Sequence, residues 1–116
     1  MALEGVVSRL IYTLDELKQI IAPIARKYAI PTVWIFGSYA RGEAREDSDV
    51  DVLIMREGSQ IRGLMIGALY DDLEQSLMKR IDLVTEESLR EKSERERSPW
   101  FIRNVYQERV PVYESN

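Results

Sequence analysis

The first long pattern in the chain is a recurrence of apolar residues with helical spacing between residues 13 and 28. These residues lie on one face of an amphipathic helix and are Leu14, Leu17, Ile20, Ile21, Ile24 and Tyr28. Thr13 and Glu16 have the spacing of a capping box, which marks a helix N-terminus. Pro23 lies inside the segment and is expected to kink or weaken one turn. The pattern therefore predicts an amphipathic helix that begins at residue 13.

Short segments rich in β-branched and aromatic residues follow and alternate with further helical patterns. The predicted strands are 32–36, 49–55, 80–85 and 110–114. The predicted helical segments are one or two turns within 39–47, a long helix over 61–77 and a helix over 100–108, with Pro99 in its first turn. This order predicts an α/β (α+β) fold with a small mixed sheet of about four strands and helices packed against it. A single domain over residues 1–116 is expected from the length.

The long helix is expected to pack one apolar face against the sheet. That face consists of Ile61, Leu64, Met65, Ala68, Leu69, Leu73 and Leu77. The last predicted strand contains Pro111, which cannot donate a hydrogen bond to a neighbouring strand. We therefore expect this strand at an edge of the sheet.

Two segments near the C-terminus allow alternative interpretations. Residues 86–97, EESLREKSERER, have the composition of a disordered linker. A solvated helix or loop is favoured, because an apolar helix and a strand follow. The C-terminal helix carries Trp100, Phe101 and Tyr106, and one of its faces is expected to pack on the sheet. The alternative is that Trp100 contacts a partner protein, since exposed aromatic residues often anchor interfaces; complete burial would exclude it.

Composition narrows the chemistry available to the chain. The 116 residues include no cysteine and no histidine, which excludes disulfides, thiolate or imidazole metal sites and Ser–His catalysis. Catalysis would have to use carboxylates, hydroxyls, Lys or Arg side chains and backbone groups. No segment has the roughly 20 apolar residues of a membrane span, and the N-terminus lacks the apolar core of a signal peptide, so a cytoplasmic location is expected. The net charge of −4 disfavours direct binding to nucleic acid.

The first candidate functional feature is Gly37-Ser38, between a predicted strand and a predicted helical turn. A glycine lets the backbone approach a ligand closely, and a helix N-terminus offers unpaired N–H groups. The Ser38 hydroxyl adds another donor, so the segment suits the outer phosphates of a triphosphate. The alternative is purely structural: Gly37 makes the turn and Ser38 caps the helix.

The second feature is a set of carboxylates at predicted strands. Asp49 and Asp51 are two positions apart and therefore face the same side of a strand, and Asp82 lies in an otherwise apolar strand. Like charges this close favour a hard cation such as Mg²⁺. The alternatives are an acidic turn at Asp49-x-Asp51 and an ion pair between Asp82 and Arg80. Together with a phosphate-binding turn, three carboxylates on neighbouring strands suit phosphoryl transfer with two metal ions.

Residues 37–51, GSYARGEAREDSDVD, resemble the signature of the polymerase-β-like nucleotidyltransferases, in which Gly-Ser is followed after ten residues by Asp-x-Asp. The longer segment FGSYARGEAREDSDVDVLI looks like the minimal nucleotidyltransferase (MNT) branch, and Ile-Asp-Leu-Val matches the segment of the third carboxylate. The resemblance extends over essentially the whole chain. It implies a nucleotidyltransferase fold and attack of a hydroxyl on the α-phosphorus of ATP, with pyrophosphate leaving.

The resemblance also implies roles for individual residues. Gly37 and Ser38 would bind the β- and γ-phosphates. Asp49 and Asp51 would ligate both Mg²⁺ ions. Asp82 would ligate the catalytic ion and assist in deprotonating the attacking hydroxyl. Arg41 would support the loop or contact phosphate.

The same resemblance suggests where the acceptor lies. Small MNT proteins resemble antitoxins paired with HEPN toxins, which are small helical ribonucleases, and the MNT protein transfers AMP to a tyrosine hydroxyl of the toxin. Two alternatives remain open. One is a module that neutralises its partner by binding alone, which the retained carboxylates disfavour. The other is a nucleotidyltransferase acting on RNA ends or a small molecule, which the acidic net charge and the lack of a substrate domain disfavour.

Overall fold

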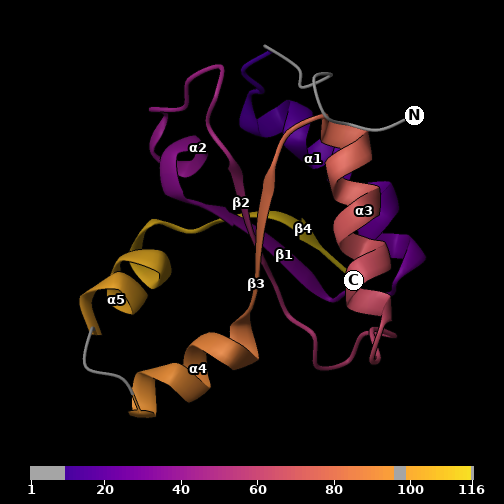
Figure 1. Ribbon diagram of the computed structural model, residues 1–116, viewed down its shortest axis with the longest axis vertical. Coiled ribbons are helices and arrows are strands. Elements are labelled where there is room, and N and C mark those ends of the chain that lie inside the picture. The colour runs from indigo at the N-terminus through magenta and orange to yellow at the C-terminus, as the bar shows by residue number, and fades with distance from the viewer. Residues whose placement is uncertain (1–9, 96–98, 116) are drawn as a thin grey trace.

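A computed structural model describes residues 10–95 and 99–115 of the chain. The first nine residues and positions 96–97 of the charged segment lie outside this description, as do the expectations that concern them. Helices and strands alternate along most of the chain (Figure 1). In order they are α1 (Leu14–Lys27), β1 (Thr32–Phe36), α2 (Gly37–Arg41), β2 (Val50–Ile54), α3 (Met65–Leu77), β3 (Ile81–Thr85), α4 (Glu86–Arg95), α5 (Pro99–Glu108) and β4 (Val110–Glu114).

The strands form one mixed sheet in the order β3-β2-β1-β4. β1 pairs antiparallel with both β2 and β4, whereas β2 and β3 are parallel. β4 is an edge strand, as its proline predicted, and Pro111 lies opposite Trp34 beside an irregularity in the pairing. The predicted fold class, a small mixed sheet with helices packed against it, is confirmed.

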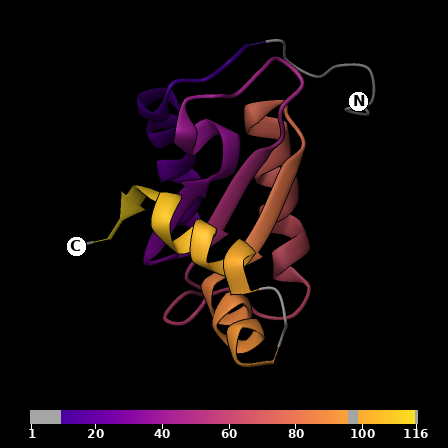
Figure 2. The same cartoon turned by 90° about the vertical axis from the view of Figure 1, so that its left-hand side faces the viewer.

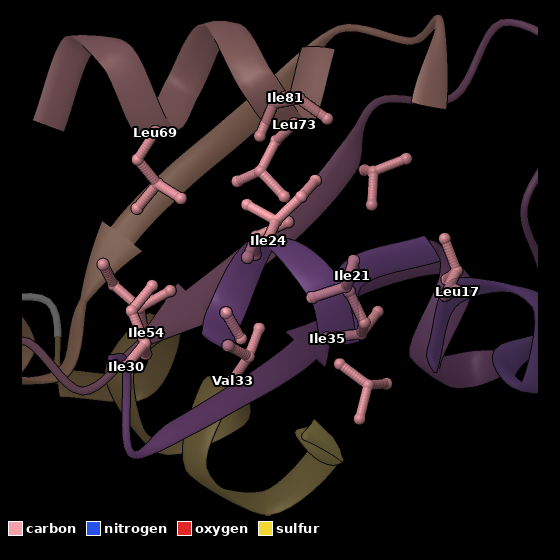
Figure 3. Packing of buried hydrophobic residues seen from close by; sticks show 14 of the residues in the cluster. Leu17, Ile21, Ile24, Ile30, Val33, Ile35, Ile54, Leu69, Leu73 and Ile81 are labelled. Carbon is pink, nitrogen blue, oxygen red and sulfur yellow. The ribbon is translucent and has the colours of Figure 1, made fainter. Parts of the chain in front are cut away.

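Helices cover both faces of the sheet, so the fold has three layers (Figures 1 and 2). α1 and α3 pack on one face, and the larger cluster of buried side chains fills that interface (Figure 3). On the opposite face, Leu89 of α4 and Ile102 and Val105 of α5 pack against Phe36 and Leu53 of the sheet. Successive residues along β1 and β2 therefore point alternately into the two hydrophobic cores on opposite faces of the sheet.

The start of α1 confirms the capping box. The Thr13 hydroxyl accepts a hydrogen bond from the Glu16 backbone N–H at 3.1 Å, and the Glu16 carboxylate accepts one from the Thr13 N–H at 2.8 Å. These reciprocal bonds satisfy two donors that the first turn leaves unpaired. α1 continues through Pro23, which lies on the exposed side.

The predicted start and apolar face of α3 need correction. The helix begins at Met65, because Gly63 takes a positive φ of 50° and interrupts the helical path before it. Ile61 is buried but precedes the helix, and Leu64 is 95% exposed. Met65 and Ala68 are exposed as well, so the packed face is narrower than predicted. It consists of Leu69, Leu73 and Leu77.

Two other segments refine the sequence prediction. α2 begins at Gly37 and ends at Arg41, before Gly42 with a φ of 73°, so the rest of 39–47 is a loop and the helical turn starts earlier than expected. The described part of the charged segment is a helix, α4, which confirms the solvated-helix interpretation over a linker. Within 10–95 and 99–115, none of the helices has the length and apolarity needed to span a bilayer.

Candidate active site

The turn from β1 into α2 brings the backbone against a carboxylate. Gly37 is buried and takes a φ of 71°, in the left-handed region that favours glycine. A Cβ at this position would overlap Asp51 Oδ2 and lie 2.9 Å from Asp51 Cγ. Gly37 is therefore required by both its backbone conformation and the close approach of Asp51.

Ser38 does not cap α2, so one structural alternative for this residue is wrong. The N-cap position is Phe36, which makes no side-chain capping bond. Ser38 lies inside the first turn, is half-buried and lines the pocket described below. Its hydroxyl is thus placed at the pocket wall rather than at the helix cap.

The sheet brings two of the predicted carboxylates together. Asp51 and Asp82 are register partners on the parallel strands β2 and β3, which are about 4.8 Å apart in a sheet. Their strand neighbours Val50 and Ile81 belong to the α1–α3 core, so both aspartates point to the opposite face. Asp49 lies one residue before β2, two positions from Asp51, and the sequence prediction that these strands are neighbours is confirmed.

Asp51 is the least exposed of the three carboxylates. Burial raises the pKa of the Asp51 carboxyl to about 6, and the nearby charges of Asp82 and Asp49 add to the increase, while Arg41 opposes it. Asp49 and Asp82 themselves are exposed. Among the ion pairs of the described residues none joins Asp82 to Arg80, so that alternative is not supported.

A single cavity of about 450 Å³ collects the predicted site residues. Its lining includes Gly37, Ser38, Arg41, Asp49, Asp51 and Asp82, all of which the sequence analysis selected. It also includes residues that the sequence analysis did not select, namely Phe36, Ser48, Phe101, Asn104, Val105 and Glu108. α5 therefore supplies one complete wall of the cavity.

Glu108 is the most closely connected of these additional residues. Its Oε1 accepts a hydrogen bond from the Gly37 backbone N–H at 3.1 Å, and its Oε2 pairs with Arg41 Nη1 at 3.0 Å. Arg41 also pairs with Glu43 at 2.9 Å through Nε. The only sequence signal for Glu108 is its helical spacing from Phe101 and Val105, which places all three on one face of α5.

The donor set fits a hard divalent cation, although the ligands are not assembled around one point. No group of three or more metal-binding side chains is already clustered among the residues that the structure describes. The donors are all carboxylates, which suit Mg²⁺, and burial together with the charges of Asp82 and Asp49 raises the pKa of the Asp51 carboxyl. Asp49 and Asp82 are exposed, and Asp82 is the register partner of Asp51, so a cation held among these carboxylates would relieve their mutual repulsion.

Comparisons with known proteins agree with this geometry. The family model described as polymerase beta nucleotidyltransferase matches residues 18–116. Protein adenylyltransferase MntA of Thermococcus cleftensis is 39% identical over 83 residues, which cover 67% of this chain and 82% of that protein. A solved structure assigned to the minimal nucleotidyltransferases has a TM-score of 0.60 at 30% identity and covers 86% of this chain and 96% of that one.

A crystal structure of a toxin–antitoxin with AMP-PNP shares the fold. Its TM-score is 0.62 at 19% identity, with coverage of 85% of this chain and 74% of that one. The family model spans most of the chain, and the residues that the motif predicts as functional line one cavity. This chain belongs to the polymerase beta nucleotidyltransferase family.

Proposed function

We propose that this protein is an antitoxin that transfers AMP from ATP to a hydroxyl group of a partner toxin. The observation that carries the proposal is that Asp49, Asp51 and Asp82 line the same cavity as the Gly37-Ser38 turn. An acidic cluster alone would repel a nucleotide. A cluster facing a backbone turn and a guanidinium suits a triphosphate that arrives with a divalent cation.

The residues that line the cavity would have two different roles. Gly37, Ser38 and Arg41 would hold the β- and γ-phosphates, which become the leaving pyrophosphate. Asp49, Asp51 and Asp82 would hold the α-phosphate region through two Mg²⁺ ions. When bound, these ions would neutralise charge on the phosphates and on the leaving group.

The reaction would be a substitution at the α-phosphorus. The oxygen of the acceptor hydroxyl forms a bond to this phosphorus, and the bond to the bridging oxygen of the β-phosphate breaks. Pyrophosphate leaves with that bonding electron pair. The hydroxyl proton passes to the Asp82 carboxylate, which is exposed to the cavity and can release it to solvent.

The nature of the acceptor follows from relatives rather than from the cavity. A protein 39% identical to this chain is named protein adenylyltransferase MntA, and a toxin–antitoxin with AMP-PNP shares the fold. The resemblance to MNT antitoxins points further to a HEPN-type toxin and to a tyrosine hydroxyl on it. The net charge of −4 makes a protein acceptor a better match than an RNA end.

Isotopic labelling tests which part of ATP is transferred. The protein would be incubated with its partner toxin, Mg²⁺ and ATP labelled at either the α- or the γ-phosphate. The proposal predicts label on the toxin from the α position only, and none with the Asp49→Ala/Asp51→Ala variant. Label from the γ position would instead indicate a kinase. No label from either position would indicate that the protein neutralises its partner by binding alone.

A further inference from the structure

Glu108 joins the end of α5 to the turn that the proposed function assigns to phosphate. The carboxylate accepts from the Gly37 N–H through Oε1 and pairs with Arg41 Nη1 through Oε2, at 3.1 and 3.0 Å. Its side chain is only 21% exposed. Two residues that are four positions apart in α2 are thereby fixed by one side chain that comes from a distant part of the sequence.

Few other interactions hold these two groups in place. Gly37 begins a helix whose N-cap residue makes no side-chain bond, and its φ of 71° lies in the left-handed region. The other partner of Arg41 is Glu43, and the two side chains are 46% and 68% exposed. Exposed pairs of this kind fix a side chain only weakly, because water and salt screen them. Glu108 is therefore the principal anchor of both groups.

If Glu108 had only a structural role, its negative charge would be unfavourable at this position. Asp49, Asp51 and Asp82 already line the same cavity, and Arg41 is the cation among the lining residues. A fourth negative charge increases the repulsion within the cavity. This cost is understandable if the charge is needed to orient Arg41, because a neutral side chain holds a guanidinium much less firmly.

We propose that Glu108 is a positioning residue of the nucleotidyl-transfer site, which holds Arg41 and the Gly37 turn in the geometry that receives the triphosphate. The inference rests on the proposed function and deepens it. The bonds to Glu108 and Glu43 use Nη1 and Nε of Arg41, so Nη2 is left to meet a phosphate oxygen. The Gly37 N–H already donates to Glu108, so the Ser38 hydroxyl would be the donor to phosphate in this turn, and Gly37 would contribute by letting the backbone come close to the phosphate.

A competing interpretation of Glu108 predicts the opposite change in nucleotide affinity when this residue is removed. If the Glu108 carboxylate occupied the place of a phosphate and had to be displaced, its removal would strengthen nucleotide binding. If Glu108 positions Arg41, its removal weakens binding, because among the described residues the ion pair that remains to Arg41 is the exposed one with Glu43. The direction of the change in affinity therefore decides between the two.

The experiment is calorimetric titration of the protein with AMP-PNP in the presence of Mg²⁺, without any partner. Glu108→Ala is expected to weaken binding roughly tenfold or more, as for the loss of a hydrogen bond to a charged group. Glu108→Gln keeps one acceptor oxygen for two donors and should give an intermediate loss. Gln107→Ala, at an exposed position next to it on α5, should leave affinity unchanged.

A second comparison separates positioning from general destabilisation. In an Arg41→Ala background, the additional loss from Glu108→Ala should be much smaller, because the two residues act as a unit. If Glu108→Ala does not fold, Glu108→Gln is compared in both backgrounds. Unchanged or tighter binding by the Glu108 variants, with wild-type protein binding normally, would overturn this inference alone. No binding by the wild type would overturn the proposed function and this inference with it.

Discussion

The Cα of Gly37 lies directly against the carboxylate of Asp51, so no side chain fits between the β1–α2 turn and β2. Both residues line the cavity, so the contact lies in its wall. Gly42, at the end of α2, provides a matched comparison. Its φ of 73° is nearly the same as that of Gly37, but a Cβ there would meet nothing within 4 Å.

The first prediction uses this pair of glycines. Gly42→Ala carries only the backbone cost and should lower the free energy of unfolding by about 1 kcal/mol. Gly37→Ala adds an overlap with Asp51 and should cost about 2–4 kcal/mol, with loss of nucleotide binding. Denaturant unfolding and calorimetric titration measure the two effects. Equal losses for both variants would show that the close approach to Asp51 has no consequence.

The second prediction concerns the pH dependence of stability. Burial and the neighbouring aspartates raise the pKa of Asp51 from 3.8 to about 6, so the folded state binds this proton more tightly than the unfolded state does. The protonated form therefore supports the fold fully below pH 3.8, and that support is lost as the pH rises through 6. At pH 7.5 the wild type carries an unfavourable charge.

Asp51→Asn removes this charge and should raise the free energy of unfolding at pH 7.5 by about 1–2 kcal/mol, after allowance for partial exposure to solvent. Below pH 4 the gain should disappear. Urea unfolding across this pH range measures it, with Asp71→Asn on the exposed side of α3 as the control. A gain that persists at pH 3.5 would point to a cause other than the carboxylate charge.

The third prediction concerns the contact between α1 and α3. Asp72 accepts a hydrogen bond from the Tyr28 hydroxyl at 2.6 Å and pairs with Lys27 at 2.9 Å. Tyr28 is buried, so Tyr28→Phe should lower the free energy of unfolding by about 1 kcal/mol. Lys27 is widely exposed and Lys27→Met should change little. A larger effect at Lys27 than at Tyr28 in thermal unfolding would contradict this assignment.

The fourth prediction concerns the exposed start of α5. Trp100 is 67% exposed, so the alternative that it contacts a partner is not excluded by burial. Trp100→Ala should leave the thermal unfolding temperature nearly unchanged and weaken binding to the proposed toxin partner at least about tenfold. Ile102→Ala, at a 6% exposed position, should cost about 2–4 kcal/mol of stability instead. Unaltered toxin binding by Trp100→Ala would place the interface elsewhere.

Local signals made much of the fold and of the motif predictable. The capping box at Thr13, the β-branched strand before Gly37 and the Asp-x-Asp pair each depend on residues close together in sequence. The adjacency of Asp51 and Asp82 followed from placing each on a strand of one small sheet. The predicted start of α3 was wrong, because the spacing of apolar residues carries no information about the positive φ of Gly63.

Glu108 was not predictable for a different reason. Its partners Gly37 and Arg41 lie far from it in sequence. No local sequence pattern predicts which end of α5 contacts the β1–α2 turn. The contact exists because β4, which follows α5 directly, pairs with β1. This pairing brings the end of α5 to the end of the strand that leads into Gly37.

The intact mass of the toxin shows whether the proposed reaction, transfer of AMP to a protein, takes place. The toxin would be incubated with Mg²⁺, ATP and either the wild-type protein or the Asp49→Ala/Asp51→Ala variant, which preserves α5 and its exposed Trp100. We expect a mass increase equal to one or more AMP units on the toxin with the wild type and none with the variant. An unchanged toxin mass, in a stable complex with the wild type, would rule out AMP transfer and show that the protein acts by binding alone.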